Sequence, residues 1–179
     1  MSRMMSKSRS LALSSLFAAL TAVGAWISVP FSPVPLTLQT FFLYLSVLIL
    51  RRNAFLSQMI YVLMGMVGLP VFARGMSGYG AILGPTGGFI VGFLAGAFIA
   101  GTIAEKTRGR ALSGVVSLLI CATIVFGFGW VWLAYWLGWN LTMALWLGVI
   151  PFLPGDCIKA GLALVLSRRI EKFLTSSQT

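Results

Sequence analysis

The chain has 179 residues, of which 59% are hydrophobic and 9% are charged, and its net charge is +10. Soluble domains carry about 25% charged residues, so this composition excludes a soluble domain and indicates an integral membrane protein. The chain has no histidine and only three acidic residues, which disfavours a metal centre or an acid–base catalytic site. The basic residues lie between apolar segments, which indicates membrane topology rather than binding of nucleic acid.

The first apolar segment, about residues 10–29, follows a polar and basic start. Its length of about 20 residues spans a bilayer, so a transmembrane helix is favoured over a signal peptide. Ala18 and Ala22 have small-xxx-small spacing, which predicts a close-packing face for another helix of this chain or of a partner. The prolines at positions 30, 33 and 35 then predict an extended connection.

Five further helices are predicted, at about residues 38–50, 54–68, 87–104, 111–133 and 145–166, the last interrupted by PFLPGD. The fold class is therefore an all-α integral membrane protein with six transmembrane helices. Residues 1–179 form a single membrane domain, with about 1–9 and 169–179 as terminal tails and about 10–168 as the six helices.

The basic residues predict the topology. Those expected on one side of the membrane are Arg3, Lys7, Arg9, Arg51, Arg52, Lys106, Arg108, Arg110, Arg168, Arg169 and Lys172. The positive-inside rule places this side, and with it both termini, in the cytoplasm. Arg74 is then the basic residue of the outer connections and Lys159 lies within the bilayer. The ligand site is expected toward the outer face.

The glycine-rich stretch from Leu69 to Gly88, LPVFARGMSGYGAILGPTGG, is predicted to form part of that site. Irregular backbone persists in a membrane where it is buried in protein or lines a cavity. The candidate ligand-binding residues here are Arg74, Gly75, Tyr79, Gly84 and Thr86. Arg74 could bind an anion or be a solvated loop charge, and the GPTGG segment could offer free amides at a helix start. Gln39, at the start of the second helix, could bind the ligand or cap the helix.

Asp156 and Lys159 lie inside an apolar segment, where a charge costs at least about 2.5–3.5 kcal/mol. Their i, i+3 spacing places them on one helix face, where they can pair. Such residues usually mark a ligand or ion path, although a buried pair could also serve packing alone. Cys121 and Cys157 are expected to be buried free thiols.

Three blocks of the sequence resemble the BioY family, the biotin-specific membrane components of energy-coupling-factor transporters. They are PVPLTLQTF (33–41), GLPVFARG with GPTGGFIVGF (68–75 and 84–93) and FLPGDCIK (152–159). The resemblance covers nearly the whole chain. It implies a six-helix subunit that takes biotin from outside and works with a transmembrane coupling subunit and two cytoplasmic ATPase subunits. It also implies that Ala18 and Ala22 contact the coupling subunit, and it matches Asp156 and Lys159 to the family's sixth-helix block.

The residues fit biotin as the transported ligand, with no cofactor, no metal and no enzymatic activity expected in this chain. Asp156 suits the ureido N–H groups because a carboxylate can accept two such bonds. Lys159 and Arg74 are both candidates for the valerate carboxylate, while Tyr79 and the backbone near Gly84 could cover the apolar part.

A lid from Pro30–Leu36 and Arg74–Gly84 is expected to close over biotin. The chain lacks the phosphate-binding motif G-x-x-x-x-G-K-[ST], so ATP hydrolysis is assigned to partners. The expected location is the bacterial plasma membrane.

Four alternatives remain at this point. They are a carrier of the same architecture for another small vitamin, a stand-alone ion-coupled transporter, an intramembrane enzyme using Asp156 and Lys159, and a structural interaction protein. The few ionisable groups disfavour the second and third, and the charges within the membrane disfavour the last.

Overall fold

A computed structural model describes residues 7–30, 33–107 and 112–176. Residues 1–6, 31–32, 108–111 and 177–179 lie outside the described part. Arg3, Arg108 and Arg110 of the predicted charge pattern and part of the predicted lid at Pro30–Leu36 therefore lie outside it as well.

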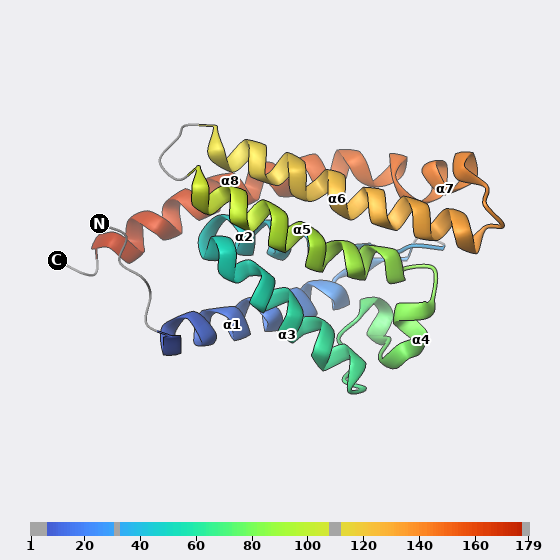
Figure 1. The fold of residues 1–179 in the computed structure, drawn as a ribbon, viewed down its shortest axis with the longest axis horizontal. Coiled ribbons are helices and arrows are strands. Elements are labelled where there is room, and N and C mark those ends of the chain that lie inside the picture. Colours follow the sequence, from blue (N-terminus) through green and yellow to red (C-terminus); the bar gives the residue numbers. More distant parts are fainter. Residues whose placement is uncertain (1–6, 31–32, 108–111, 177–179) are drawn as a thin grey trace.

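The described residues form a bundle of helices with a short two-stranded hairpin at one end (Figure 1). The helices are α1 (Lys7–Trp26), α2 (Gln39–Leu50), α3 (Ala54–Met66), α4 (Gly78–Leu83), α5 (Gly87–Lys106), α6 (Ser113–Trp136), α7 (Leu141–Gly148) and α8 (Leu153–Ser176). The 3₁₀ turns are η1 (Arg51–Asn53), η2 (Ala73–Gly75) and η3 (Ile150–Phe152). Strand β1 (Ser28–Val29) pairs antiparallel with β2 (Leu36–Thr37).

The last predicted helix, at about residues 145–166 with an interruption at PFLPGD, is interrupted near the expected place but begins earlier and ends later than expected. Two helices, α7 and α8, occupy this region, and η3 separates them. Pro151 lies in η3 and lacks the amide hydrogen that a continuous helix needs there. Pro154 lies in the first turn of α8, where proline is tolerated because its amide would have no partner.

Two further expectations need correction. The glycine-rich stretch is not irregular throughout, because Gly78–Leu83 forms the short helix α4. Part of each predicted terminal tail is helical, since α1 begins at Lys7 and α8 continues to Ser176.

Helices α2 and α3 are short, and the chain reverses between them. The first residue of α2, Gln39, donates a hydrogen bond to Tyr61 in the second half of α3. At 1.5 Å per residue the two helices are about 18 and 20 Å long, whereas a bilayer core is about 30 Å thick. Five segments of the described chain are long and apolar enough to cross a membrane when α2 and α3 count together as Gln39–Met66. The predicted number of six spans stays a prediction.

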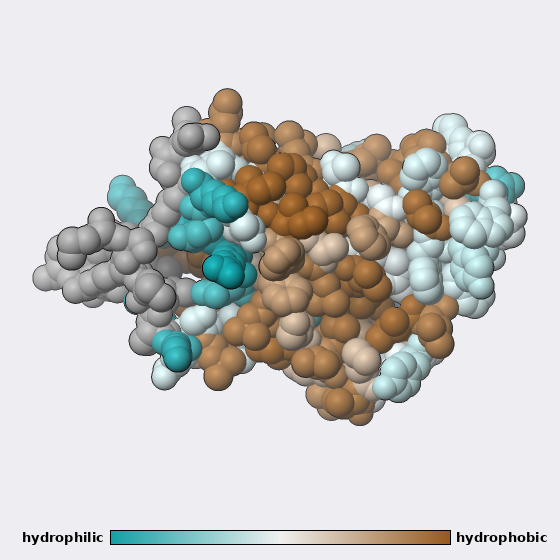
Figure 2. All heavy atoms as spheres, viewed as in Figure 1, coloured by the Kyte–Doolittle hydropathy of each residue, from teal (hydrophilic) through white to brown (hydrophobic). Residues whose placement is uncertain are grey.

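The two ends of the bundle differ in polarity. Figure 2 shows a hydrophobic belt between a hydrophilic end and a paler end. At the hydrophilic end lie α1's start and α8's end (Figure 1), and the exposed basic residues of η1, α5 and α8 are Arg52, Lys106, Arg168, Arg169 and Lys172. The exposed aromatic residues lie at the other end: Trp26 ends α1, Tyr135 and Trp136 end α6, and Trp139 lies between α6 and α7. This distribution is typical of a protein that crosses a membrane.

Helices α5 and α6 pack closely through glycines spaced four residues apart in α5. A Cβ atom added at Gly92 would lie 2.9 Å from the Cα of Val125, and one at Gly96 would lie 3.1 Å from the sulfur of Cys121. A Cβ at Gly88 would lie 2.5 Å from the carbonyl oxygen of Phe128. The predicted tight-packing face of this helix is therefore confirmed.

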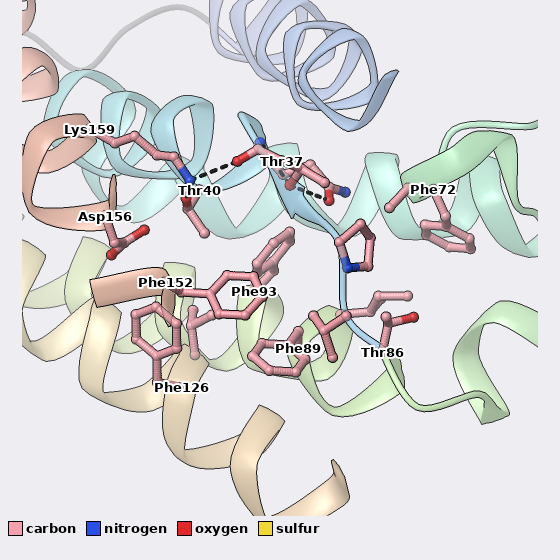
Figure 3. A pocket seen from close by; sticks show the side chains of 16 residues that line it. Thr37, Thr40, Phe72, Thr86, Phe89, Phe93, Phe126, Phe152, Asp156 and Lys159 are labelled. Carbon is pink, nitrogen blue, oxygen red and sulfur yellow. Dashed lines mark hydrogen bonds between the residues drawn. The ribbon is translucent and has the colours of Figure 1, made fainter. Parts of the chain in front are cut away.

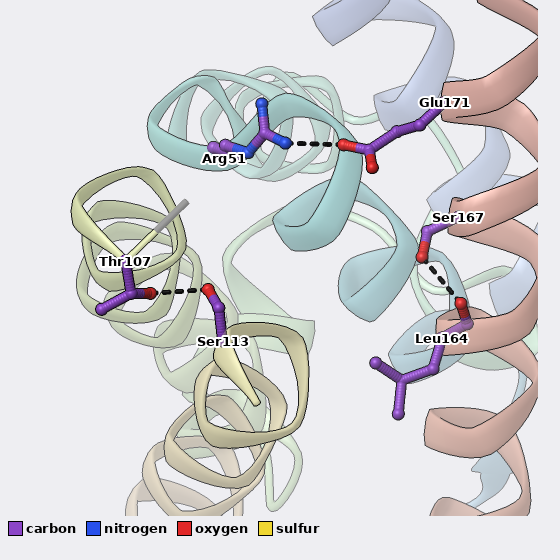
Figure 4. Close-up of polar contacts among 6 residues, drawn as sticks. All are labelled: Arg51, Thr107, Ser113, Leu164, Ser167 and Glu171. Atoms are coloured by element: carbon purple, nitrogen blue, oxygen red, sulfur yellow. Dashed lines mark hydrogen bonds and ion pairs between the residues drawn. The ribbon is translucent and has the colours of Figure 1, made fainter. Parts of the chain in front are cut away.

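At the hydrophilic end, an ion pair joins the turn between α2 and α3 to α8. The Nη2 atom of Arg51 lies 2.6 Å from Oε1 of Glu171 (Figure 4). The backbone of Arg51 has a φ of 54°, in the left-handed region. The absence of a side chain at Gly101 lets α5 approach the Arg51 carbonyl closely, so this turn is fixed from two sides.

At the opposite end, indole groups fix the segment that joins α3 to α5. Trp26 donates to the carbonyl of Pro70 at 2.9 Å. Trp132 donates to the carbonyl of Gly84 at 2.8 Å, and Trp136 donates to that of Leu83 at 2.9 Å. This segment is thereby attached to the ends of α1 and α6.

Candidate functional site

A pocket lies where α2, α5, α6 and α8 meet the connections that precede α2 and α4 (Figure 3). Four of the predicted ligand-binding residues line it: Gln39, Thr86, Asp156 and Lys159. They come from segments far apart in the sequence, and the fold brings them to one cavity.

Asp156 provides a buried carboxylate in this pocket. Its side chain is only 5% exposed, and it accepts a hydrogen bond from the hydroxyl of Tyr44 through Oδ2. Asp156 also lies in the first turn of α8, where the positive end of the helix dipole favours a negative charge. These two features offset the cost of placing a carboxylate at membrane depth.

Lys159 lies one turn further along α8 and reaches toward α2. Its ammonium group donates to the carbonyl oxygen of Thr37 at 2.7 Å and to Oγ1 of Thr40 at 3.1 Å (Figure 3). In the described part of the chain, the predicted ion pair between Lys159 and Asp156 is not formed, and the hydrogen bonds of Lys159 are those to Thr37 and Thr40. An ammonium group has three donors, so one donor is left beyond these two contacts.

Gln39 holds the entrance of α2 in place. Its side chain accepts a hydrogen bond from Oγ1 of Thr37 at 2.9 Å and donates one to the hydroxyl of Tyr61. Thr37 partly fulfils the capping role that was predicted for Gln39, because Oγ1 of Thr37 accepts a hydrogen bond from the backbone amide of Gln39 at 3.3 Å.

Aromatic side chains form the walls between the polar groups. Phe89 and Phe93 come from α5, Phe126 from α6 and Phe152 from η3. They lie between Asp156 at one end of the cavity and Thr86 at the other (Figure 3). A pocket with an apolar middle and polar groups at its ends suits an elongated organic molecule with polar ends.

Four predicted site residues are not among the described residues that line the pocket: Arg74, Gly75, Tyr79 and Gly84. Arg74 and Tyr79 are exposed, and the carbonyl of Gly84 accepts from Trp132. Their neighbours Phe72 and Ala73 line the cavity instead. The turn η2 and the helix α4 place these predicted residues outside the pocket lining. The sequence did not predict this course of the chain.

Ala18 and Ala22 lie on the side of α1 that faces the rest of the bundle. Ala18 is fully buried and Ala22 is 9% exposed, and both belong to the main hydrophobic core. Their small-xxx-small spacing lets α1 pack closely against the rest of this chain, which is one of the two predicted possibilities; the other is packing against a partner. Their role in docking a coupling subunit stays a prediction.

Several residues that shape the site were not predicted from the sequence. Tyr44 and Thr40 lie one turn apart on α2 and contact the two charged residues of α8. Two hydroxyl groups at i, i+4 in an otherwise apolar helix are a signal that could have identified them. Cys157 is exposed, contrary to the prediction that both cysteines are buried.

The described residues contain no group of three or more His, Cys, Asp or Glu side chains that could hold a metal ion. The chemistry within reach of the pocket is hydrogen bonding and charge. These groups can bind and orient a ligand.

Comparisons with known proteins relate the whole chain to one family. The profile of the BioY family matches residues 1–176. The probable biotin transporter BioY of Pyrococcus horikoshii is 44% identical over 166 residues, which cover 92% of this chain and 98% of that protein. The biotin transporter BioY of Thermotoga maritima is 40% identical over 168 residues, which cover 92% and 96%.

A solved structure has the same fold. It is the crystal structure of the S-component for biotin from an ECF-type ABC transporter, with a TM-score of 0.82 and 28% sequence identity. The match covers 94% of this chain and 95% of that one.

Proposed function

This chain belongs to the BioY family, and from that membership we infer that it is the biotin-binding S-component of an energy-coupling-factor transporter. Relatives named as biotin transporters and the solved biotin S-component support this role. The chain acts in transport rather than in catalysis. The observation in the molecule itself that carries the inference is the pocket, which has Asp156 and Lys159 at one end and Thr86 at the other.

The proposed orientation of biotin follows from the spacing of these groups. Asp156 and Lys159 are one helical turn apart, so both can reach the same end of a ligand. The ureido group presents N–H donors and a carbonyl acceptor side by side. We assign its N–H groups to the carboxylate of Asp156 and its carbonyl oxygen to the remaining donor of Lys159.

The valerate carboxylate then extends toward Thr86. The hydroxyl of Thr86 is a donor at the start of α5, and an anion is favoured near the start of a helix. The phenylalanine side chains between the two ends would cover the thioether ring and the alkyl chain. Arg74, the alternative predicted from the sequence, does not line the cavity and has no contact with biotin in this orientation.

Energy coupling is assigned to partners. We propose that a transmembrane coupling subunit and cytoplasmic ATPase subunits act with this chain in the plasma membrane, as the description of the solved relative as part of an ECF-type ABC transporter suggests. The basic end of the bundle, which holds the start of α1 and the end of α8, would face the cytoplasm. The pocket would then receive biotin from the outer side.

Calorimetry of the purified chain in detergent, without partner subunits, tests the biotin site. We expect tight binding of biotin and no binding of thiamine or riboflavin. Replacing Asp156 by Asn should weaken biotin binding by about 10-fold or more, because a hydrogen bond to a charged group is worth about 1.5–3 kcal/mol. Glu171→Gln, which removes a carboxylate remote from the pocket, should leave the affinity unchanged. Unchanged affinity in folded Asp156→Asn would exclude the ureido role.

The orientation is tested by comparing biotin with its uncharged amide. Thr86→Val should weaken binding of biotin more than binding of the amide, because the lost hydroxyl contact is to the carboxylate. Lys159→Met should weaken both ligands by the same factor. The reverse pattern, in which Lys159→Met affects biotin alone, would place the carboxylate at Lys159 and reverse the ligand.

A further inference from the structure

A second cavity lies between α6, α7 and α8, on the outside of the bundle. Its volume is about 390 Å³, and its lining is largely apolar, including Leu119, Ala122, Trp130, Leu153, Cys157 and Ala160. Leu119, Leu153 and Cys157 are exposed, so the cavity is a groove open to the side. Because α6 and α8 lie in segments long and apolar enough to cross a membrane, the groove opens toward the hydrocarbon of the bilayer.

The groove runs along α8 toward its basic end. Leu153, Cys157, Ala160 and Leu164 line it at successive intervals of three or four residues, which is one face of a helix. Leu153 and Leu164 are 11 positions apart, or about 16 Å at 1.5 Å per residue. On α6 the lining extends from Val115 to Trp130, 15 positions or about 22 Å. The groove therefore spans at least about half of a core about 30 Å thick.

A positive charge lies at the end of this face. Arg168 follows Leu164 by four residues and therefore continues the same face of α8. Arg168 and its neighbour Arg169 are both exposed. Figure 4 labels Leu164 on α8 and Ser113 at the start of α6. A Cβ atom added at Gly114 would lie 2.9 Å from Cδ2 of Leu164, so the two helices approach each other here. Basic sites next to a cleft between transmembrane helices recognise anionic lipid head groups.

We propose that this groove binds an anionic phospholipid. One acyl chain lies along α6 and α8, and the phosphate group lies beside Arg168 and Arg169. The apolar lining and the length of the groove account for the acyl chain, and the arginines account for the negative charge of the head group. Asp156 and Phe126 line both this groove and the ligand pocket. The acyl chain in the groove therefore also excludes water from the side of these residues that faces away from the pocket.

Lipid titration of the purified chain in detergent tests the proposal. Phosphatidylglycerol and phosphatidylcholine are added separately, and bound lipid is measured by native mass spectrometry. We expect phosphatidylglycerol to bind at least about 10-fold more tightly than phosphatidylcholine, since each nearby basic residue favours an anionic lipid. Arg168→Gln with Arg169→Gln should abolish this preference. Arg52→Gln, at the same end of the molecule but on η1, should preserve it.

A second pair of variants tests the acyl-chain site. Gly127 lines the groove, and a Cβ atom there meets nothing within 4 Å, so the side chain of Gly127→Phe starts in open space and should occupy part of the groove. The variant should lose both lipids. Gly161→Phe is the matched control, because Gly161 is also open and does not line the groove. Thermal unfolding without lipid should confirm that both variants fold.

Three results would overturn the proposal. Equal binding of the two lipids by the wild type would remove the role of the arginines. Undiminished lipid binding by folded Gly127→Phe would remove the role of the groove. A dimer that Gly127→Phe disrupts, in place of a lipid adduct, would make the groove an interface between two copies of this chain.

Discussion

The position of the Asp156 carboxylate depends on Tyr44. Tyr44 is fully buried, and its hydroxyl donates to Oδ2 of Asp156 from the neighbouring helix α2. A buried carboxylate with a fixed donor is held in one orientation, since losing the donor leaves a charge without compensation. Tyr44 therefore acts as a positioning residue for the proposed ureido contact.

Replacing Tyr44 by Phe should weaken biotin binding by about 10-fold, since the hydrogen bond it removes involves a charged group. The double variant Tyr44→Phe/Asp156→Asn should bind no more weakly than Asp156→Asn alone, because coupled residues are not additive. Calorimetry on the four proteins measures this cycle, and Tyr135→Phe, at an exposed tyrosine, is the control. Fully additive losses would mean that Tyr44 does not act through Asp156.

The residues that the sequence identified best are polar groups in apolar segments. Asp156 and Lys159 could be identified because a charged side chain in an apolar membrane segment is costly and is usually functional. Both line the pocket. The phenylalanines of the walls could not be selected, because an aromatic residue in a membrane helix can equally face lipid. Tyr79, also predicted to bind the ligand, is exposed and does not line the pocket. The sequence does not show that α4 directs this residue toward the surface.

Helices α5 and α6 form the most closely packed pair in the described structure, and glycine makes this contact possible. The backbones meet at Gly88, Gly92 and Gly96, where any side chain would press into α6. The sequence shows that these glycines are spaced four residues apart. It does not show which helix packs against them, because a glycine lets any helix approach closely. The α5–α6 pair carries Phe89, Phe93 and Phe126 of the ligand pocket.

Gly88→Val should destabilise the protein, because the new side chain meets Trp132 and the carbonyl of Phe128. Overpacking costs about 1–3 kcal/mol, so we expect the thermal midpoint in detergent to fall by roughly 5 °C. Gly127→Val is the matched control, since a Cβ atom at Gly127 has no neighbour within 4 Å. Equal midpoints for the two variants would show that the interface can relax.

The whole molecule is polarised along its long axis. Basic residues gather at the end that holds η1 and the end of α8, and aromatic residues gather at the other (Figures 1 and 2). The composition and the charge pattern were enough to predict a helical membrane protein with such an axis. The chain reverses at η1, so α2 and α3 are each too short to be counted as a separate membrane span by length. The number of times the chain crosses the membrane could therefore not be determined from the sequence.

Labelling of single cysteines tests the proposed topology. In a chain with Cys121→Ala and Cys157→Ala, one exposed residue is replaced at each end: Thr142→Cys on α7 and Arg52→Cys on η1. We expect a membrane-impermeant maleimide to label Thr142→Cys in intact cells. Arg52→Cys should react only after the membrane is permeabilised. The opposite pattern would invert the orientation of the chain.

The indole hydrogen bonds at the aromatic end give this protein built-in optical probes. Trp26, Trp132 and Trp136 each donate to a backbone carbonyl of the segment between α3 and α5. The same segment contributes Phe72 and Ala73 to the pocket wall. Indole emission depends on its hydrogen bonds and on its contact with water, so a shift of this segment changes the wavelength and intensity of the intrinsic fluorescence. A shift of this segment on ligand entry can thus be followed in real time on the unlabelled protein.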